Sequence, residues 1–142
     1  MLTKEYAAMA KANTPEYTDY ANRPFELTRA EQKYFWENVS KVLFAVSINI
    51  PVYMCDHEQF PGDAQDALGM HWKNAEGDEF ITIDNFFIHE CYEVAFNGAY
   101  DINGEDLVSV LCHELAHIRY QRHTKYHAEL TEKYIGMVRE EK

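Results

Sequence analysis

Apolar and polar residues follow two different periods along the chain, one typical of helices and one typical of strands. Thr28 and Glu31 have the spacing of a capping box, in which each side chain bonds the backbone of the other residue at the start of a helix. After them, apolar side chains recur every three or four positions, which predicts a first main helix over 29–46. The apolar positions are Tyr34, Phe35, Val39, Val42, Leu43 and Val46.

Three segments have the pattern of strands. Apolar residues alternate with others through Ser47–Met54, and Pro51 within this segment indicates the edge of a sheet, because proline cannot donate a ladder hydrogen bond. Leu68–Asn74 and Glu79–Phe87 follow, and the polar link Ala75–Asp78 between them is typical of a hairpin. We therefore expect a small sheet in the middle of the chain.

Two further helices are predicted in the last third of the chain. Residues 88–103 fit no single element and contain Asn-Gly turn signals. Asn103 is a suitable N-cap for a helix over 104–120, and Thr124 is a suitable N-cap for a last helix over 125–140. The order helix, strands, two helices predicts an α+β fold in which an antiparallel or mixed sheet packs on helices.

The composition suits one globular domain. The chain has 142 residues, of which 46% are apolar and 14% aromatic, enough to form one core. Residues 1–26 are polar, with Pro15 and Pro24 as breakers and a short helix expected over Thr3–Ala12, and we assign them as an extension of a domain over 27–142. No apolar run approaches the roughly 20 residues that span a bilayer, and the N-terminus lacks the order of a secretory signal. We therefore expect a cytoplasmic protein with no membrane partner.

The charge and the cysteines restrict the possible partners and chemistry. A formal net charge of −11 argues against a nucleic-acid partner, because a phosphate backbone repels such a surface except at a local basic cluster. The basic cluster consists of Arg119, Arg122 and Lys125. The cysteines are far apart and form no Cys-x-x-Cys pair, so we expect buried free thiols instead of disulfides or a zinc ribbon. They are Cys55, Cys91 and Cys112.

The segment His113–His117 reads His-Glu-Leu-Ala-His inside a predicted helix. The two histidines are four positions apart, so they lie on one face of the helix and can hold one metal ion. Glu114 lies just beside that face, where its carboxylate can take a proton from water that the ion has acidified. The pattern predicts a zinc hydrolase with Glu114 as the general base. A separate stripe faces the core, formed by Leu107, Leu111, Leu115 and Ile118.

His123 is the expected third metal ligand. On one straight helix it would lie about 15 Å from His113 along the axis, too far to share an ion. It can bind only if the helix ends near Tyr120 and the chain turns back. Thr124, as the cap of the next helix, places a break at that point.

Other polar residues near the motif have weaker patterns. His127 and Glu129 are alternative third ligands, and we interpret His127 as a surface residue or as one that supports a ligand. The remaining histidines are interpreted as ordinary structural residues, and they are His57, His71 and His89. Candidates for stabilising an oxyanion, by position alone, are Tyr120, Tyr126 and Tyr134.

The pattern His-Glu-Leu-Ala-His-x5-His over His113–His123 resembles the SprT-like zinc metallopeptidases and their relatives, the YgjP-like and WLM groups. The resemblance covers about the C-terminal half of the chain and implies a zincin-like fold, a protein or peptide substrate, and Glu114 as the catalytic base. It also implies that Phe80–Asp84 is the edge strand that aligns the substrate. Relatives often carry an aromatic residue where this chain has His127. The zinc ligands that the resemblance implies are His113, His117 and His123.

Two other functions fit the same residues. The spacing also matches the YbeY-type endoribonucleases, which bind zinc through His-x3-His-x5-His but carry glycine where this chain has Glu114. Alternatively, the metal could be structural in a protein-binding domain, which would require a fourth protein ligand in place of water. A carboxylate beside the ion and the acidic surface favour the peptidase over the endoribonuclease. A fourth protein ligand, from His127 or Glu129, would favour the structural alternative.

Overall fold

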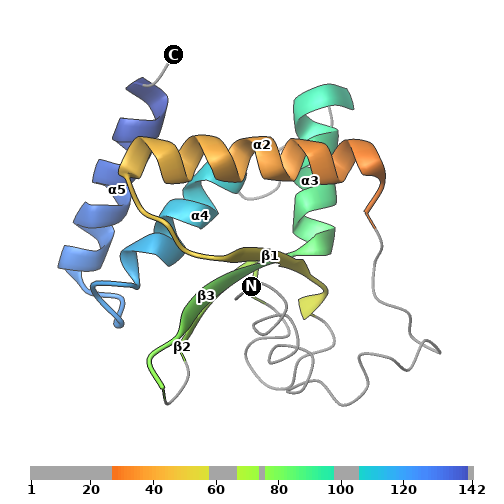
Figure 1. Cartoon of the computed structure of the whole chain (residues 1–142). Coiled ribbons are helices and arrows are strands. Elements are labelled where there is room, and N and C mark those ends of the chain that lie inside the picture. The colour runs from red at the N-terminus through yellow and green to blue at the C-terminus, as the bar shows by residue number, and fades with distance from the viewer. Residues whose placement is uncertain (1–26, 58–66, 74–75, 98–105, 141–142) are drawn as a thin grey trace.

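The computed structural model describes residues 27–57, 67–73, 76–97 and 106–140 (Figure 1). The helix expected over Thr3–Ala12 and the expected cap Asn103 lie outside these residues. The described part is α+β with a mixed sheet, as the sequence predicts. Its elements are α2 (Arg29–Val46), β1 (Val52–Cys55), β2 (Gly69–Lys73), β3 (Glu79–Asp84), α3 (Asn85–Asn97), α4 (Leu107–Ala116) and α5 (Lys125–Glu140).

Helix α2 has the predicted bounds, because local signals fix both of its ends. At its start, the Thr28 hydroxyl accepts from the backbone N–H of Glu31 at 3.1 Å, and the Glu31 carboxylate accepts from the backbone N–H of Thr28 at 2.8 Å. At its end, Ser47 has a left-handed backbone with φ of 57°, and its N–H bonds the last carbonyls of the helix. The predicted apolar stripe is buried at Phe35, Val39, Val42 and Val46.

The central strand of the sheet is β3, with β1 parallel on one side and β2 antiparallel on the other. The expected edge position of Phe80–Asp84 is therefore wrong. Its apolar residues are nearly continuous in sequence, and such a strand is typically buried on both faces. The edge strand beside α4 is β2. Pro51 immediately precedes β1, the other edge strand, so its predicted edge placement is confirmed.

Two strands are shorter than predicted. The strand expected over Ser47–Met54 is reduced to β1, which starts after Pro51, and the strand expected over Glu79–Phe87 ends at Asp84. The Asp84 side chain accepts from the backbone N–H of Phe87 at 3.2 Å, as an N-cap does at a helix start. The chain therefore enters α3, an element that the sequence left unassigned.

Helix α4 is shorter than predicted at both ends, because it starts at Leu107 in place of 104 and ends at Ala116 in place of 120, whereas α5 lies where predicted. Asp106 and Ser109 form the capping box of α4, so this helix starts at Leu107 and not at 104. At α5, the Thr124 hydroxyl accepts from the backbone N–H of His127 at 3.3 Å, which confirms Thr124 as the cap.

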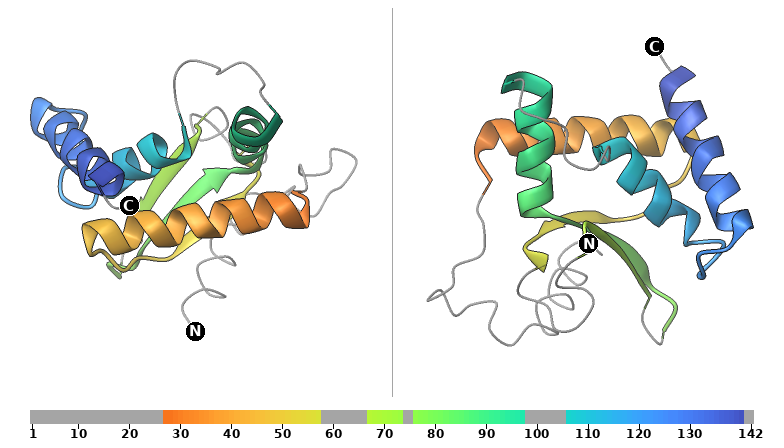
Figure 2. Two further views of the ribbon diagram at one scale, coloured as in Figure 1. Left: turned by 90° about the horizontal axis from the view of Figure 1, so that it is seen from above. Right: turned by 180° about the vertical axis from the view of Figure 1, so that it is seen from behind.

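All the described helices lie on one side of the sheet (Figures 1 and 2). Helix α4 packs against β2 and β3 below it and against α2 and α5 on its other sides. The expected stripe on α4 is in the core, with Leu107, Leu111 and Leu115 fully or almost fully buried and Ile118 packed against them. Within the described part of the chain, no helix has the length and apolar character needed to cross a membrane.

Candidate metal centre

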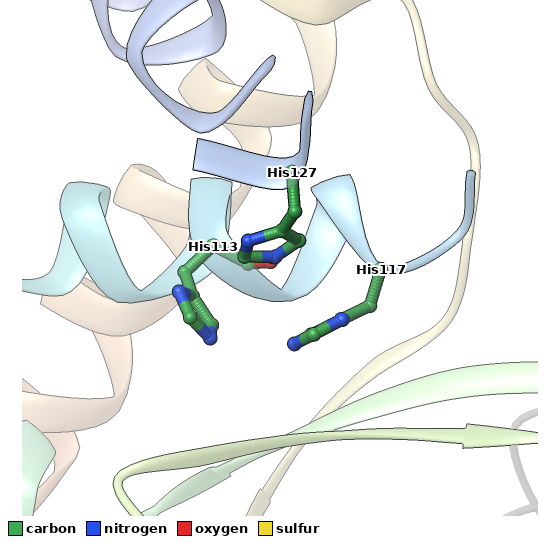
Figure 3. Close-up of side chains that lie close together, drawn as sticks. All are labelled: His113, His117 and His127. Atoms are coloured by element: carbon green, nitrogen blue, oxygen red, sulfur yellow. The ribbon is translucent and has the colours of Figure 1, made fainter. Parts of the chain in front are cut away.

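Two histidines project from the C-terminal end of α4 toward the sheet (Figure 3). His113 lies in the last turns of the helix, and His117 is its C-cap residue. Their ring centroids are 4.9 Å apart, with the rings nearly perpendicular. The i, i+4 spacing therefore places both imidazoles on one face, as the sequence predicts.

His123 joins this pair because the chain turns back after α4. The backbone N–H of Tyr120 donates to the carbonyl of Ala116 at 2.9 Å, which closes the last turn, and Thr124 caps the next helix. The Nε2 atom of His123 then lies 3.1 Å from Nε2 of His113 and 3.1 Å from Nε2 of His117. The break that the sequence required before His123 is present, and the three predicted ligand residues are brought together.

The protonation of His113 and His117 leaves ring nitrogens with a lone pair available for a metal ion. The backbone carbonyl of Tyr120 can only accept, so Nδ1 of His117 donates to it at 3.0 Å and the neutral ring has a bare Nε2. Burial, reinforced by the neighbouring histidines, lowers the pKa of His113 to about 4, and burial also lowers the pKa of His117. Both rings are therefore neutral at physiological pH.

A cation shared among the rings would satisfy the three converging nitrogens. The single Nε2 of His123 contacts both partners, and one N–H cannot make two well-directed bonds at once. Two nitrogens bound to a tetrahedral zinc ion at about 2.0–2.1 Å lie about 3.3 Å from each other. The observed separations are close to that value, so the donor set and its spacing fit a zinc ion.

His127 supports this cluster from the first turn of α5. Its ring is buried, stacks on the His117 ring at a centroid distance of 4.1 Å, and donates from Nε2 to the backbone carbonyl of His113 at 2.9 Å. His113, His117 and His127 also offer ligand atoms within 4.8 Å of one another, but Nε2 of His127 is already engaged by the carbonyl of His113. His123, whose Nε2 contacts both other rings, is therefore the candidate for the third ligand position, and His127 is the candidate for a supporting position. The other alternative, Glu129, is exposed on α5.

Glu114 is buried beside this cluster, with 6% of its surface exposed. Burial raises the pKa of its carboxyl to about 7, against the opposing effect of a hydrogen bond from the backbone N–H of His71. Glu114 and His113 both line a cleft of about 210 Å³. A carboxyl with a pKa near neutrality is suited to accept and return a proton.

The sequence did not reveal that β2 lies against Glu114. Gly69 permits this contact, because a Cβ atom there would lie 2.9 Å from Val110 Cγ1 and 3.1 Å from Glu114 Cγ. His71 on the same strand has its ring centroid 6.4 Å from that of His117, and its Nε2 lies 2.6 Å from the Glu79 carboxylate. A glycine within a strand can mark such a close approach, so Gly69 was the available signal.

The other residues that the sequence singled out have structural environments. The buried His57 ring contacts Ala67 O and Thr82 Oγ1, and His89 contacts the capping-box residue Glu31. Tyr120 stacks on the exposed Tyr126, and Tyr134 packs against the core. The basic cluster is on the surface, where Arg119 and Lys125 lie over Tyr120 and Tyr126. All of the cysteines are buried free thiols, as predicted.

Comparison with known proteins identifies no relative of the chain. The chain matches no protein-family model, no curated protein and no solved structure.

Proposed function

We propose that the chain is a zinc-dependent metallopeptidase in which His113, His117 and His123 hold the ion and Glu114 is the general base. The observation that carries the proposal is the position of His123, whose Nε2 lies 3.1 Å from Nε2 of His113 and 3.1 Å from Nε2 of His117. The buried carboxyl of Glu114, with a pKa of about 7, lies beside these rings. Three imidazole ligands leave one position open for water and substrate, which is typical of catalytic zinc sites. When bound, the ion would polarise the peptide carbonyl and acidify water.

Glu114 would perform the proton transfers. Because its pKa is near 7, a large fraction of the carboxyl is ionised at neutral pH and can accept a proton from the attacking water. The protonated carboxyl can then deliver that proton to the amine that leaves. The His71 N–H holds the carboxylate in place and favours its ionised form.

The neighbouring edge strand supports a peptide as the substrate. In the described sheet, β2 is an edge strand and packs against α4. An extended peptide can pair with such an edge through main-chain hydrogen bonds, which would lay it across the cleft next to Glu114. The zincin-like fold, the SprT-like relationship and the cytoplasmic location expected from the sequence are part of the same proposal.

The test compares metal content and proteolysis in matched variants. We expect the purified protein to hold about one zinc ion per chain and to cleave an unstructured protein such as casein. Glu114→Gln should keep the metal and lose about 10²–10⁴-fold in cleavage rate, the usual contribution of a general base. Glu129→Gln, on the exposed face of α5, is the control and should cleave at the wild-type rate.

Three results would refute the proposal. A zinc-loaded protein that cleaves no polypeptide is the first, and an active Glu114→Gln variant is the second. The third is cleavage of RNA in place of protein, which would assign the site to the nuclease alternative.

A further inference from the structure

The chain that leads from α4 into α5 carries the basic cluster, formed by Arg119, Arg122 and Lys125, at one end of the molecule (Figure 1). Residues 117–128 contain no aspartate or glutamate, although the whole chain has 24 acidic and 13 basic residues. Positive charge is therefore concentrated at one place in a protein whose net charge is −11.

The charges of the basic cluster are exposed and ordered. Among the residues that the structure describes, none of the three cations forms an ion pair. The Arg119 guanidinium lies 5.7 Å from the ring centroid of Tyr120, and the Lys125 ammonium lies 5.4 Å from that of Tyr126. The two tyrosine rings stack on each other at 6.0 Å. These contacts hold two of the cations without neutralising them, so the cluster can bind an anionic group.

The basic cluster lies next to the candidate metal centre. His123, whose Nε2 is 3.1 Å from the two other converging nitrogens, stands between Arg122 and Lys125 in the sequence. The backbone N–H of Thr124 donates to the carbonyl of Arg122 at 2.9 Å, which fixes the turn. A peptide bound at the metal would therefore pass beside the cluster.

The range of electrostatic forces determines which charges such a peptide experiences. At an ionic strength of about 0.15 M, charges in water are screened beyond roughly 8 Å. Negative charges elsewhere on the protein then contribute little, and the adjacent cations dominate. At about 1 M salt the screening distance falls to roughly 3 Å, so the attraction of the cluster should also be lost.

We propose that the basic cluster binds acidic side chains of the substrate within a few residues of the scissile bond. The proposal rests on the proposed peptidase function and names its substrate class, which is acidic peptide segments. A nucleic-acid strand is also anionic, but its charge continues beyond the cluster, where the net charge of −11 opposes it. An acidic peptide segment can confine its charge to the cluster.

The experiment uses peptides of one sequence that carry glutamate, glutamine or lysine at the positions flanking the cleaved bond. One exposed charge pair changes affinity by about 1.5–5-fold, so three together should lower KM for the glutamate peptides on the order of 10-fold relative to the glutamine peptides. Because these contacts are remote from the reacting atoms, kcat should change little. The preference should be lost at about 1 M salt.

Substitutions in the basic cluster should change this preference in opposite directions. Replacing all three cations by glutamine should remove it, and Arg122→Glu should shift it toward the lysine peptides. Arg122 is exposed and contributes only its backbone carbonyl to the turn, so this variant should fold. The zinc content of each variant should equal that of the wild type, which separates loss of charge from damage to the metal centre.

Lys33→Glu is the matched control, because it changes the net charge by the same amount as Arg122→Glu. Lys33 is exposed near the start of α2, and that end of the helix lies on the opposite side of the molecule from the connection between α4 and α5 (Figures 1 and 2). The control should keep the wild-type preference. The same shift in both variants would mean that net charge and not the cluster selects the substrate, which would overturn the inference.

Two further results would overturn the inference and leave the peptidase proposal intact. The first is an equal KM for the glutamate and glutamine peptides with the wild type. The second is a single-stranded oligonucleotide that binds through the three cations more tightly than the acidic peptides, which would assign the basic cluster to nucleic acid.

A binding measurement separates the basic cluster from the chemistry. Zinc-loaded Glu114→Gln should bind fluorescently labelled glutamate peptides about 10-fold more tightly than glutamine peptides, and should lose this difference when the three cations are replaced. If the wild type cleaves no peptide, the proposed function fails. The binding series then decides the cluster by itself, because equal binding of both peptides refutes it.

Discussion

The backbone N–H of His71 donates to the carboxylate of Glu114, so the edge strand of the sheet is bonded to the helix that carries the candidate base. Gly69, two residues earlier, allows the strand to come this close. Strand β2 therefore contributes a wall of the cleft, a hydrogen-bond donor to the carboxylate and an edge for an extended peptide.

Replacement of Glu114 should stabilise the metal-free protein at alkaline pH. The pKa of this carboxyl is raised from 4.5 to about 7 on folding, so the folded state binds more protons than the unfolded chain between these values. Stability from the protonated carboxyl is full below pH 4.5 and is lost as pH rises through 7. At pH 8 the loss amounts to about 3 kcal/mol. Glu114→Gln should recover much of it, as measured by urea unfolding at pH 5 and pH 8 with a chelator present. If the free energy of unfolding depended on pH equally in the variant and the wild type, the raised pKa of the buried Glu114 carboxyl would be contradicted.

Gly69→Ala should destabilise the protein, because the added Cβ would meet Val110, Glu114 and Ile83 at 2.9–3.1 Å. Overpacking of this kind costs about 1–3 kcal/mol. Gly136→Ala is the control, since a Cβ there meets nothing within 4 Å and alanine favours the interior of α5. It should raise the free energy of unfolding by about 0.5–1 kcal/mol. Thermal or urea unfolding measures both changes, and effects of the same sign would contradict the close approach at Gly69.

His127→Phe should weaken metal binding without removing a ligand. Phenylalanine keeps a ring against His117 but loses the hydrogen bond to the carbonyl of His113. Loss of an outer partner commonly lowers metal affinity by about 10–100-fold. His123→Ala, which removes a proposed ligand, should lower it further. Competition with a chromophoric chelator measures the zinc affinity of both variants. If His127→Phe lost more affinity than His123→Ala, His127 would be the ligand and His123 the supporting residue.

Thr82→Val should destabilise the sheet, because this hydroxyl contacts both His57 Nε2 and Trp72 Nε1 in the interior. Removing one partner from buried polar groups costs about 1–3 kcal/mol. Valine has nearly the same shape, so packing is conserved. Thr82→Ser, which retains the hydroxyl, serves as the comparison, and urea unfolding of the two should separate the hydrogen bonds from the lost methyl group. Equal stability of Thr82→Val and wild type would mean that the hydroxyl contributes nothing.

The sequence predicted best where neighbouring residues alone determine the structure. The capping box at Thr28 and the cap at Thr124 lie within three residues of the groups they bond, and α2 and α5 have the predicted bounds. The same local reasoning placed a break before His123 and so brought the three histidines together. Asp106 shows the limit of this approach, because Asn103 offered an equally suitable cap a few residues earlier.

Features that depend on contacts through space were missed. Strand order does not follow from the pattern of β3, since its apolar run suits a central strand as well as an edge strand facing other chain segments. The bond between His71 and Glu114 joins residues more than forty positions apart, and no local pattern encodes it. A local cap was missed as well, since Asp84 accepts from the backbone N–H of Phe87 only three residues later, where the strand pattern continues.

The turn after Ala116 links the assembly of the candidate metal centre to the docking of the last helix. Helix α4 supplies two of the converging rings, while His123 and the supporting His127 arrive only when the last helix has docked. An ion held there would connect the start of the C-terminal helix α5 to α4 and so stabilise the docked position of α5. Loosening of that helix and release of the ion would then be one event, so zinc in the medium would slow the opening of this end of the chain.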